Sequence, residues 1–121
     1  MKLRYSLPIA VVLAVLSLML ATPAFAADGH GCAHDPTVQS LRNCVIHAAG
    51  AGHIDNQGIT NSLLAKLDAA QAALDRGQTK TAVNNLNAFV RAVEAQDGKH
   101  IVSPHATHLA MHANQVIAAI E

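Results

Sequence analysis

Histidine is the residue type with which this chain could do chemistry, because it occurs 8 times among 121 residues. His105, His108 and His112 are spaced i, i+3 and i+7, which places them within about 60° of one another on a helix. Imidazoles at this spacing can converge on one Zn²⁺ or Cu²⁺ ion, and His100 just before them could supply a fourth ligand. The sequence therefore predicts a zinc or copper site at His100, His105, His108 and His112. The alternative is a solvated helix face without specific affinity.

The spacing of His108 and His112 is also that of metalloprotease helices, but the catalytic glutamate between the two histidines is missing. The intervening residues are Leu109, Ala110 and Met111, so we expect no hydrolytic machinery there. A G-x-S-x-G elbow, a phosphate-binding glycine loop and a haem attachment motif are also absent from the sequence. We therefore expect no catalytic residues and no enzyme activity.

Cys32 and Cys44 are the two cysteines, and their spacing excludes a C-x-x-C motif. In an exported protein they predict a disulfide, with a pair of buried free thiols as the alternative. A helix starting at Pro36 would place Cys44 about 13 Å along its axis, whereas the segment before it reaches only about 10 Å. The bond therefore requires that this segment fold straight back along the helix, or that the helix begin later, for example after Ser40.

Asp28-Gly29-His30 could form a second copper site, in which a free amino group at Asp28 would join two backbone nitrogens and the imidazole in a square plane. This site needs one trimming step after the predicted cleavage. His34 beside Cys32 could bind a metal ion if the thiol were free, but oxidation of the cysteine would remove that ligand.

The first 26 residues have the pattern of a cleaved signal peptide. Lys2 and Arg4 precede the apolar run 7–20, and Ala24-Phe25-Ala26 offers small residues at the positions that a signal peptidase reads. A retained membrane anchor is the alternative, but the run is shorter than the roughly 20 residues of a spanning helix and Pro23 follows it. We expect residues 1–26 to be removed, 27–35 to be mobile, and the mature chain to be secreted or periplasmic with no membrane span.

The mature composition excludes several classes of partner. Losing Lys2 and Arg4 with the leader leaves six basic against eight acidic residues, a net charge of −2, so a nucleic-acid partner is not expected. Phe89 is the only mature aromatic residue and there is no Trp. Carbohydrate binding is therefore not expected either, because such sites rely on stacking rings.

The periodicity of the mature chain is helical throughout and predicts an all-α, compact antiparallel four-helix bundle over 36–121. Expected helix starts are Asp35-Pro36 or Ser40, Asp55 or Asn56, Thr79, and Ser103-Pro104 with Ser103 as the cap; expected stops are Gly50 and Gly52, Gly77, and Gly98. The residues expected to face the core are Val38, Leu41, Val45, Ala48, Ile59, Leu63, Leu67, Ala70, Leu74, Ala82, Leu86, Phe89, Val93, Leu109, Ala113, Val116, Ile117 and Ile120. The three histidines centre about 90° from the apolar stripe of the last helix, so we expect them to be exposed or half-exposed.

Several stretches of this helical region resemble the FIMAH domain. They are GHIDNQGI at 52–59, SLLAKL at 62–67, LNAFV at 86–90 and GKHI at 98–101. The resemblance covers about Leu41 to Ile120 and implies a small helical module of secreted bacterial and archaeal proteins, often found C-terminal to hydrolases or in surface proteins. It implies no catalytic residues and no cofactor.

Together these observations predict a non-catalytic, secreted accessory module that docks on another exported protein or on the cell surface. Because no larger enzyme accompanies the module in this sequence, we expect that partner to be a separate molecule. The alternative function is that of an extracytoplasmic zinc or copper protein that uses the histidines of the last helix.

Overall fold

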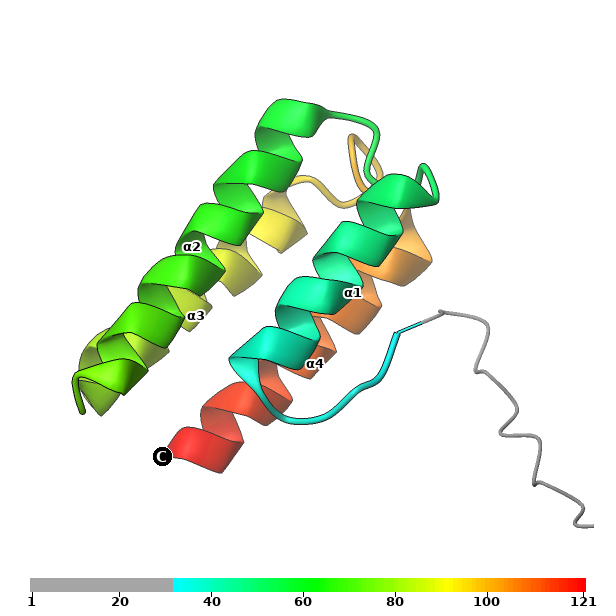
Figure 1. Ribbon diagram of the computed structural model, residues 1–121. Helices are drawn as coiled ribbons and strands as arrows, with labels where there is room; N and C mark the ends of the chain where they lie inside the picture. Colours follow the sequence, from blue (N-terminus) through cyan, green and yellow to red (C-terminus); the bar gives the residue numbers. More distant parts are fainter. Residues whose placement is uncertain (1–31) are drawn as a thin grey trace, which may run out of the picture.

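The computed structural model describes residues 32–121, which fold into four helices (Figure 1). These are α1 (Val38–Gly50), α2 (Gln57–Asp75), α3 (Thr79–Ala95) and α4 (Ser103–Ile120). The predicted signal peptide and the predicted copper site at Asp28-Gly29-His30 lie outside the described residues. Among the helices described, none combines the length and the apolar character needed to cross a membrane.

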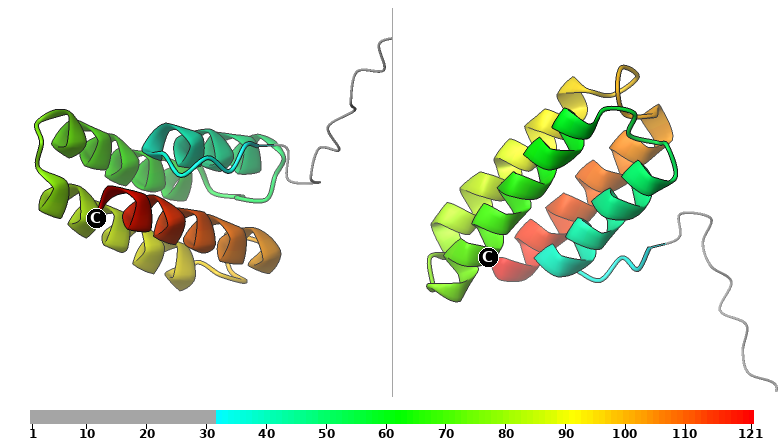
Figure 2. Two further views of the ribbon diagram at one scale, coloured as in Figure 1. Left: turned by 90° about the horizontal axis from the view of Figure 1, so that it is seen from below. Right: turned by 45° about the horizontal axis from the view of Figure 1, so that its top comes forward.

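The four helices run alternately up and down and form a closed ring of neighbours. α2 packs against α1 and α3, and α4 packs against α3 and α1, as the views in Figures 1 and 2 show. Each connection is short, so consecutive helices are antiparallel. The predicted all-α four-helix bundle is confirmed.

The core consists of the apolar stripes that the periodicity marks. Of the predicted core residues, fourteen are at most 4 % exposed; Ile59, Leu74, Ile117 and Ile120 are only partly buried and pack against the core. Alanines at 0 % exposure, among them Ala70, Ala82 and Ala113, take part in this core. Their small side chains let the helix backbones approach one another closely.

The helix ends follow the capping residues, with two departures from the prediction. Asn56 caps α2, where its side-chain oxygen accepts a hydrogen bond from the Ile59 amide. α1 begins at neither predicted start, since Thr37 caps it by accepting from the Ser40 amide. The prediction that Ser103 caps α4 is wrong: Val102 stands at the cap without a side-chain bond, and Ser103 is already helical.

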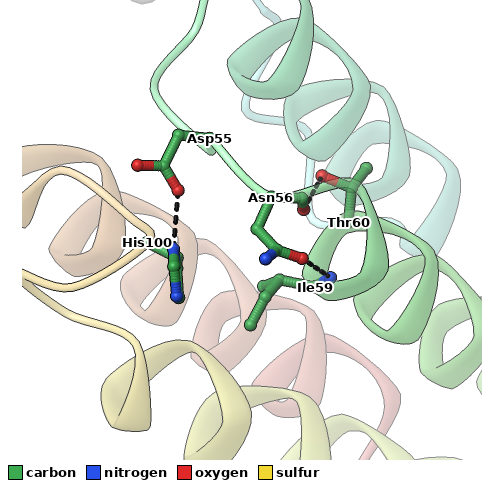
Figure 3. Close-up of polar contacts among 5 residues, drawn as sticks. All are labelled: Asp55, Asn56, Ile59, Thr60 and His100. Atoms are coloured by element: carbon green, nitrogen blue, oxygen red, sulfur yellow. Dashed lines mark hydrogen bonds and ion pairs between the residues drawn. The ribbon is translucent and has the colours of Figure 1, made fainter.

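Two loops meet at the end of the bundle where α1 leads into α2 and α3 leads into α4. Ile54 pairs with Ile101 in a short antiparallel bridge, and both side chains are buried. Figure 3 shows the polar contacts beside this bridge, among them the Asp55 carboxylate 2.8 Å from Nδ1 of His100. The turn before Ile101 needs Gly98, whose φ of 73° disfavours a residue with a side chain. The relative positions of these two loops are therefore fixed by backbone bonds.

The segment before α1 folds back along that helix (Figures 1 and 2) and reaches Cys44 on its second turn. Cys32 and Cys44 form a disulfide with their Cα atoms 5.2 Å apart, which is a common separation for such a bond. The predicted disulfide is confirmed, and of the two routes proposed for it the chain takes the fold-back. The Asp35 amide donates to Oγ of Ser40, and that hydroxyl donates to the Ala33 carbonyl. These contacts hold residues 32–35, the described part of the segment expected to be mobile, against α1.

Candidate functional site

Histidines gather around a cavity of about 20 Å³ between α1, α4 and the segment before α1. A space of this size holds about one water-sized occupant. We call this cavity the histidine pocket. Its lining residues are Cys32, His34, Cys44, His47, Ala48, His105, His108, Leu109 and His112.

His112 is the buried member of the histidine pocket, at 3 % exposure. Its Nε2 lies 2.7 Å from the Asp35 carbonyl oxygen. A carbonyl can only accept a hydrogen bond, so Nε2 carries the proton and Nδ1 of the neutral ring presents a lone pair. That Nδ1 is buried and has no hydrogen-bond partner. A histidine that ligates a metal ion through one nitrogen commonly donates the other N–H to a backbone carbonyl in this way.

Burial also determines the charge of His112. Removal from water lowers the pKa of His112 below its ordinary value of 6.5, because a buried imidazolium loses hydration. The hydrogen bond to Asp35 raises this pKa, the nearby His34 lowers it, and the Asp35 charge raises it. The net shift is downward and keeps the ring neutral, which is the form that can bind a metal ion.

His34 and the disulfide form the side of the pocket opposite α4. Nε2 of His34 lies 3.8 Å from Sγ of Cys32, and the His34 ring meets the His112 ring edge to face with centroids 5.3 Å apart. One ligand atom from each of Cys32, His34 and Cys44 lies within 4.8 Å of the other two. The two sulfurs of the disulfide and one imidazole nitrogen are therefore grouped on this side of the pocket.

The remaining pocket histidines come from two helices. His105 and His108 are half-buried on α4, and His47 is exposed on α1. The His105 ring also stacks on His53 of the loop between α1 and α2, with centroids 3.6 Å apart and an angle of 18° between the planes. Five histidines thus line one cavity, three of them from a single face of α4.

His100 is placed away from the other three histidines of the predicted metal set. It does not line the histidine pocket but a shallow hollow at the loop end of the bundle, where it pairs with Asp55. The structure therefore brings together His105, His108 and His112 and separates His100 from them.

The exposure predicted for the α4 histidines is only partly correct. The expected exposed or half-exposed face describes His105 and His108, but it is wrong for His112. The reason is that the segment before α1 folds over this side of α4 and brings the Asp35 carbonyl to the ring. The sequence relates His34 only to Cys32, and it does not place His34 or His47 in one cavity with the α4 histidines. Spacing along one helix carries no information about its neighbour.

Comparison with known proteins places this fold in a family. No curated protein and no solved structure matches the chain. A family model, the FIMAH domain, matches residues 38–118. The match runs from the first residue of α1 into the last turn of α4, and Cys32 and His34 lie before it. The match covers most of the chain and all four helices, and on this ground the chain belongs to the FIMAH domain family.

Proposed function

We propose that this FIMAH domain is a non-catalytic module that binds one divalent transition-metal ion, Zn²⁺ or Cu²⁺, in the histidine pocket. Imidazole nitrogen is a preferred ligand of both ions. The ligands we assign are Nδ1 of His112 with the rings of His34 and His108, which line the same cavity and have to turn toward one ion to bind it. The metal function thus keeps His108 and His112 of the sequence prediction, leaves out His105 and replaces His100 with His34.

One observation carries this proposal: His112 holds a neutral, buried Nδ1 without a hydrogen-bond partner beside a cavity lined by four further histidines. Leaving a polar atom buried and unbonded costs about 1–3 kcal/mol. A metal ion would satisfy this atom. The Asp35 carbonyl on the opposite nitrogen would then keep the ring oriented toward the ion.

Calorimetry with Zn²⁺ and Cu²⁺ on tag-free, metal-stripped protein with an intact disulfide tests the proposal. We expect one equivalent bound with a Kd of about 1 µM or tighter. His112→Gln should weaken binding at least about tenfold, because its amide can still donate to Asp35 while the Nδ1 ligand is lost. His100→Gln is the matched control and should bind like the parent protein.

Two outcomes of this experiment would overturn the proposal. One is the absence of saturable binding in the parent protein. The other is an equal loss of affinity in His112→Gln and His100→Gln, which would place the ion elsewhere. The melting temperature gives an independent readout, since a ligand at 100 times its Kd stabilises the folded state by about 2.7 kcal/mol.

Docking on another exported protein or on the cell surface is the second candidate function, and the family match favours it. The family consists of small helical modules, which suits an accessory role. Within residues 32–121 the large exposed apolar side chains are Ile46, Val102 and Met111. Loss of partner binding in Met111→Ser or Ile46→Ser, with metal binding unchanged, would support docking. Both candidate functions assume that the chain is exported, as its leader predicts. The disulfide agrees with export, because disulfides persist in oxidising compartments.

A further inference from the structure

We infer that reduction of the disulfide converts the histidine pocket into a tetrahedral zinc site formed by Cys32, Cys44, His34 and His112. This inference rests on the proposed function, from which it takes His34, His112 and the metal. It adds that the thiol–disulfide state of the cysteines sets the affinity and the ligand set of the site.

One distance among three of the four ligands already suits such a site, and the other two are close to it. In a tetrahedral zinc site with Zn–S bonds of about 2.3 Å and Zn–N bonds of about 2.0–2.1 Å, ligand atoms lie about 3.3–3.8 Å apart. The ligand atoms of Cys32, His34 and Cys44 all lie within 4.8 Å of one another. The His34 nitrogen is 3.8 Å from the Cys32 sulfur. After reduction the two sulfurs need only separate to reach this spacing.

The fourth ligand is His112, and its position relative to His34 supports this assignment. Two imidazoles bound to one tetrahedral zinc ion have ring centres about 5 Å apart, given Zn–N bonds of about 2.0–2.1 Å. The centroids of His34 and His112 are 5.3 Å apart. His112 is also held in the ligating tautomer by the Asp35 carbonyl. Two elements that are distant in sequence, the segment before α1 and α4, thus supply the two nitrogens.

The disulfide is placed so that a reductant can reach one of its sulfurs. Cys32 is partly exposed and borders an open hollow of about 380 Å³, whereas Cys44 is 3 % exposed. A thiolate of a dithiol reductant attacks Sγ of Cys32, and Cys44 leaves as a thiolate. The second thiolate of the reductant then attacks the reductant's own sulfur in the mixed disulfide and releases the Cys32 thiolate. The dithiol is oxidised to a disulfide as the protein disulfide is reduced by two electrons.

Zinc then binds without any change in its own oxidation state, because Zn²⁺ has no redox chemistry in proteins. Thiolates are also softer ligands than imidazoles and favour zinc. The bound ion occupies the electron pairs that would re-form the disulfide, so disulfide formation and zinc binding through the two thiolates exclude each other. Reduction should therefore increase zinc binding in the pocket. Oxidation should remove the two thiolate ligands and leave the ion to the weaker site formed by imidazoles alone.

The test compares Co²⁺ and Zn²⁺ binding by the oxidised protein and by protein reduced with a phosphine that is then removed without oxygen. We expect the reduced protein to bind at least about tenfold more tightly than the oxidised protein. With Co²⁺ it should show thiolate-to-metal charge transfer and tetrahedral visible bands. His112→Gln and His34→Gln should each weaken this binding, and His100→Gln should not.

The Cys32→Ser/Cys44→Ser protein separates this inference from the proposed function. It should lack the charge-transfer band and the gain in affinity on reduction, yet it should still bind the metal ion through the imidazole rings of the pocket. Reduction that leaves the affinity and spectrum of the parent protein unchanged overturns the inference alone. Thiolate bands on reduction, together with no binding by the oxidised protein, overturn the proposed function alone. If the reduced protein loses helical circular dichroism, zinc should restore it, and failure to do so also contradicts the inference.

Discussion

The α2–α3 half and the α1–α4 half of the bundle bury different kinds of residue. α2 and α3 bury Leu63, Leu67, Leu86 and Phe89 at 1 % exposure or less, and neither helix contains a histidine. α1 and α4 also bury apolar side chains, but His112 is among them, and their shared cavity is lined by histidines and closed by a disulfide. We therefore assign the stabilising core mainly to the α2–α3 half and the proposed metal site to the α1–α4 half.

The largest effect that this comparison predicts is that of Phe89→Ala. Phe89 is the largest fully buried side chain within residues 32–121, and removing a buried aromatic ring costs about 3–5 kcal/mol of unfolding free energy. Urea denaturation measures the loss. Zinc affinity of the protein that remains folded should be unchanged, since Phe89 does not line the histidine pocket. A loss below about 1 kcal/mol would contradict the structural role assigned to α2 and α3.

The next largest effect is expected from Cys32→Ser/Cys44→Ser. The disulfide closes a loop with a sequence separation of 12, and a loop of this length stabilises the folded state by about 3 kcal/mol in the chain-entropy model. Thermal and urea denaturation in the absence of metal measure the change. Reduction of the parent protein should cause a similar loss. An unchanged melting temperature would show that the segment before α1 is held without the bond.

A smaller effect is expected from Asn56→Ala at the start of α2. The side-chain oxygen of Asn56 accepts a hydrogen bond from the Ile59 amide at 3.0 Å. Removing such a cap lowers the free energy of unfolding by about 1 kcal/mol. Asn61→Ala, on an exposed position inside the same helix, is the matched control and should be neutral or slightly stabilising. Equal effects of the two substitutions would contradict the capping role. Metal binding should be unaffected by both.

The smallest effect we expect is a pH dependence of stability caused by His112. Its folded pKa is lowered by burial, so the unfolded chain binds more protons as the pH falls below the unfolded value of about 6.5. The metal-free protein should therefore lose stability between about pH 7 and pH 5. His112→Gln should flatten this part of the curve, while His47→Gln, at an exposed position, should leave it. Parallel curves for His112→Gln and the parent protein would contradict the burial argument.

The sequence predicts the helices well because each helix carries its own information. Spacing of apolar residues identifies the buried faces, and Asn56 and Gly77 mark their helix ends through local hydrogen bonding and through a φ of 73° at Gly77. The disulfide follows from two cysteines and a predicted export signal. The prediction for Ser103 is wrong because the position of Val102 is set by a distant loop. The Val102 amide donates a hydrogen bond to the His53 carbonyl of that loop, and spacing along α4 does not reveal this contact.

The histidine pocket could be predicted only in part. The spacing of His105, His108 and His112 shows that they share a face of α4, but not which segment covers that face. Burial of His112 depends on the fold-back of the segment before α1, and the separation of His100 depends on Asp55 from another loop. Both are tertiary contacts between residues 45 or more positions apart. The spacing of residues within one helix cannot predict these tertiary contacts.

Nitrogen-15 NMR of the imidazole rings, recorded before and after addition of one equivalent of Zn²⁺ to the oxidised protein, tests the central claim most directly. We predict that metal-free His112 is neutral with its proton on Nε2. Zinc should shift Nδ1 of His112 and the ring of His34, and it should leave the His100 ring unchanged. A proton on Nδ1 of His112, or zinc-induced shifts confined to His47 and His100, would contradict the account.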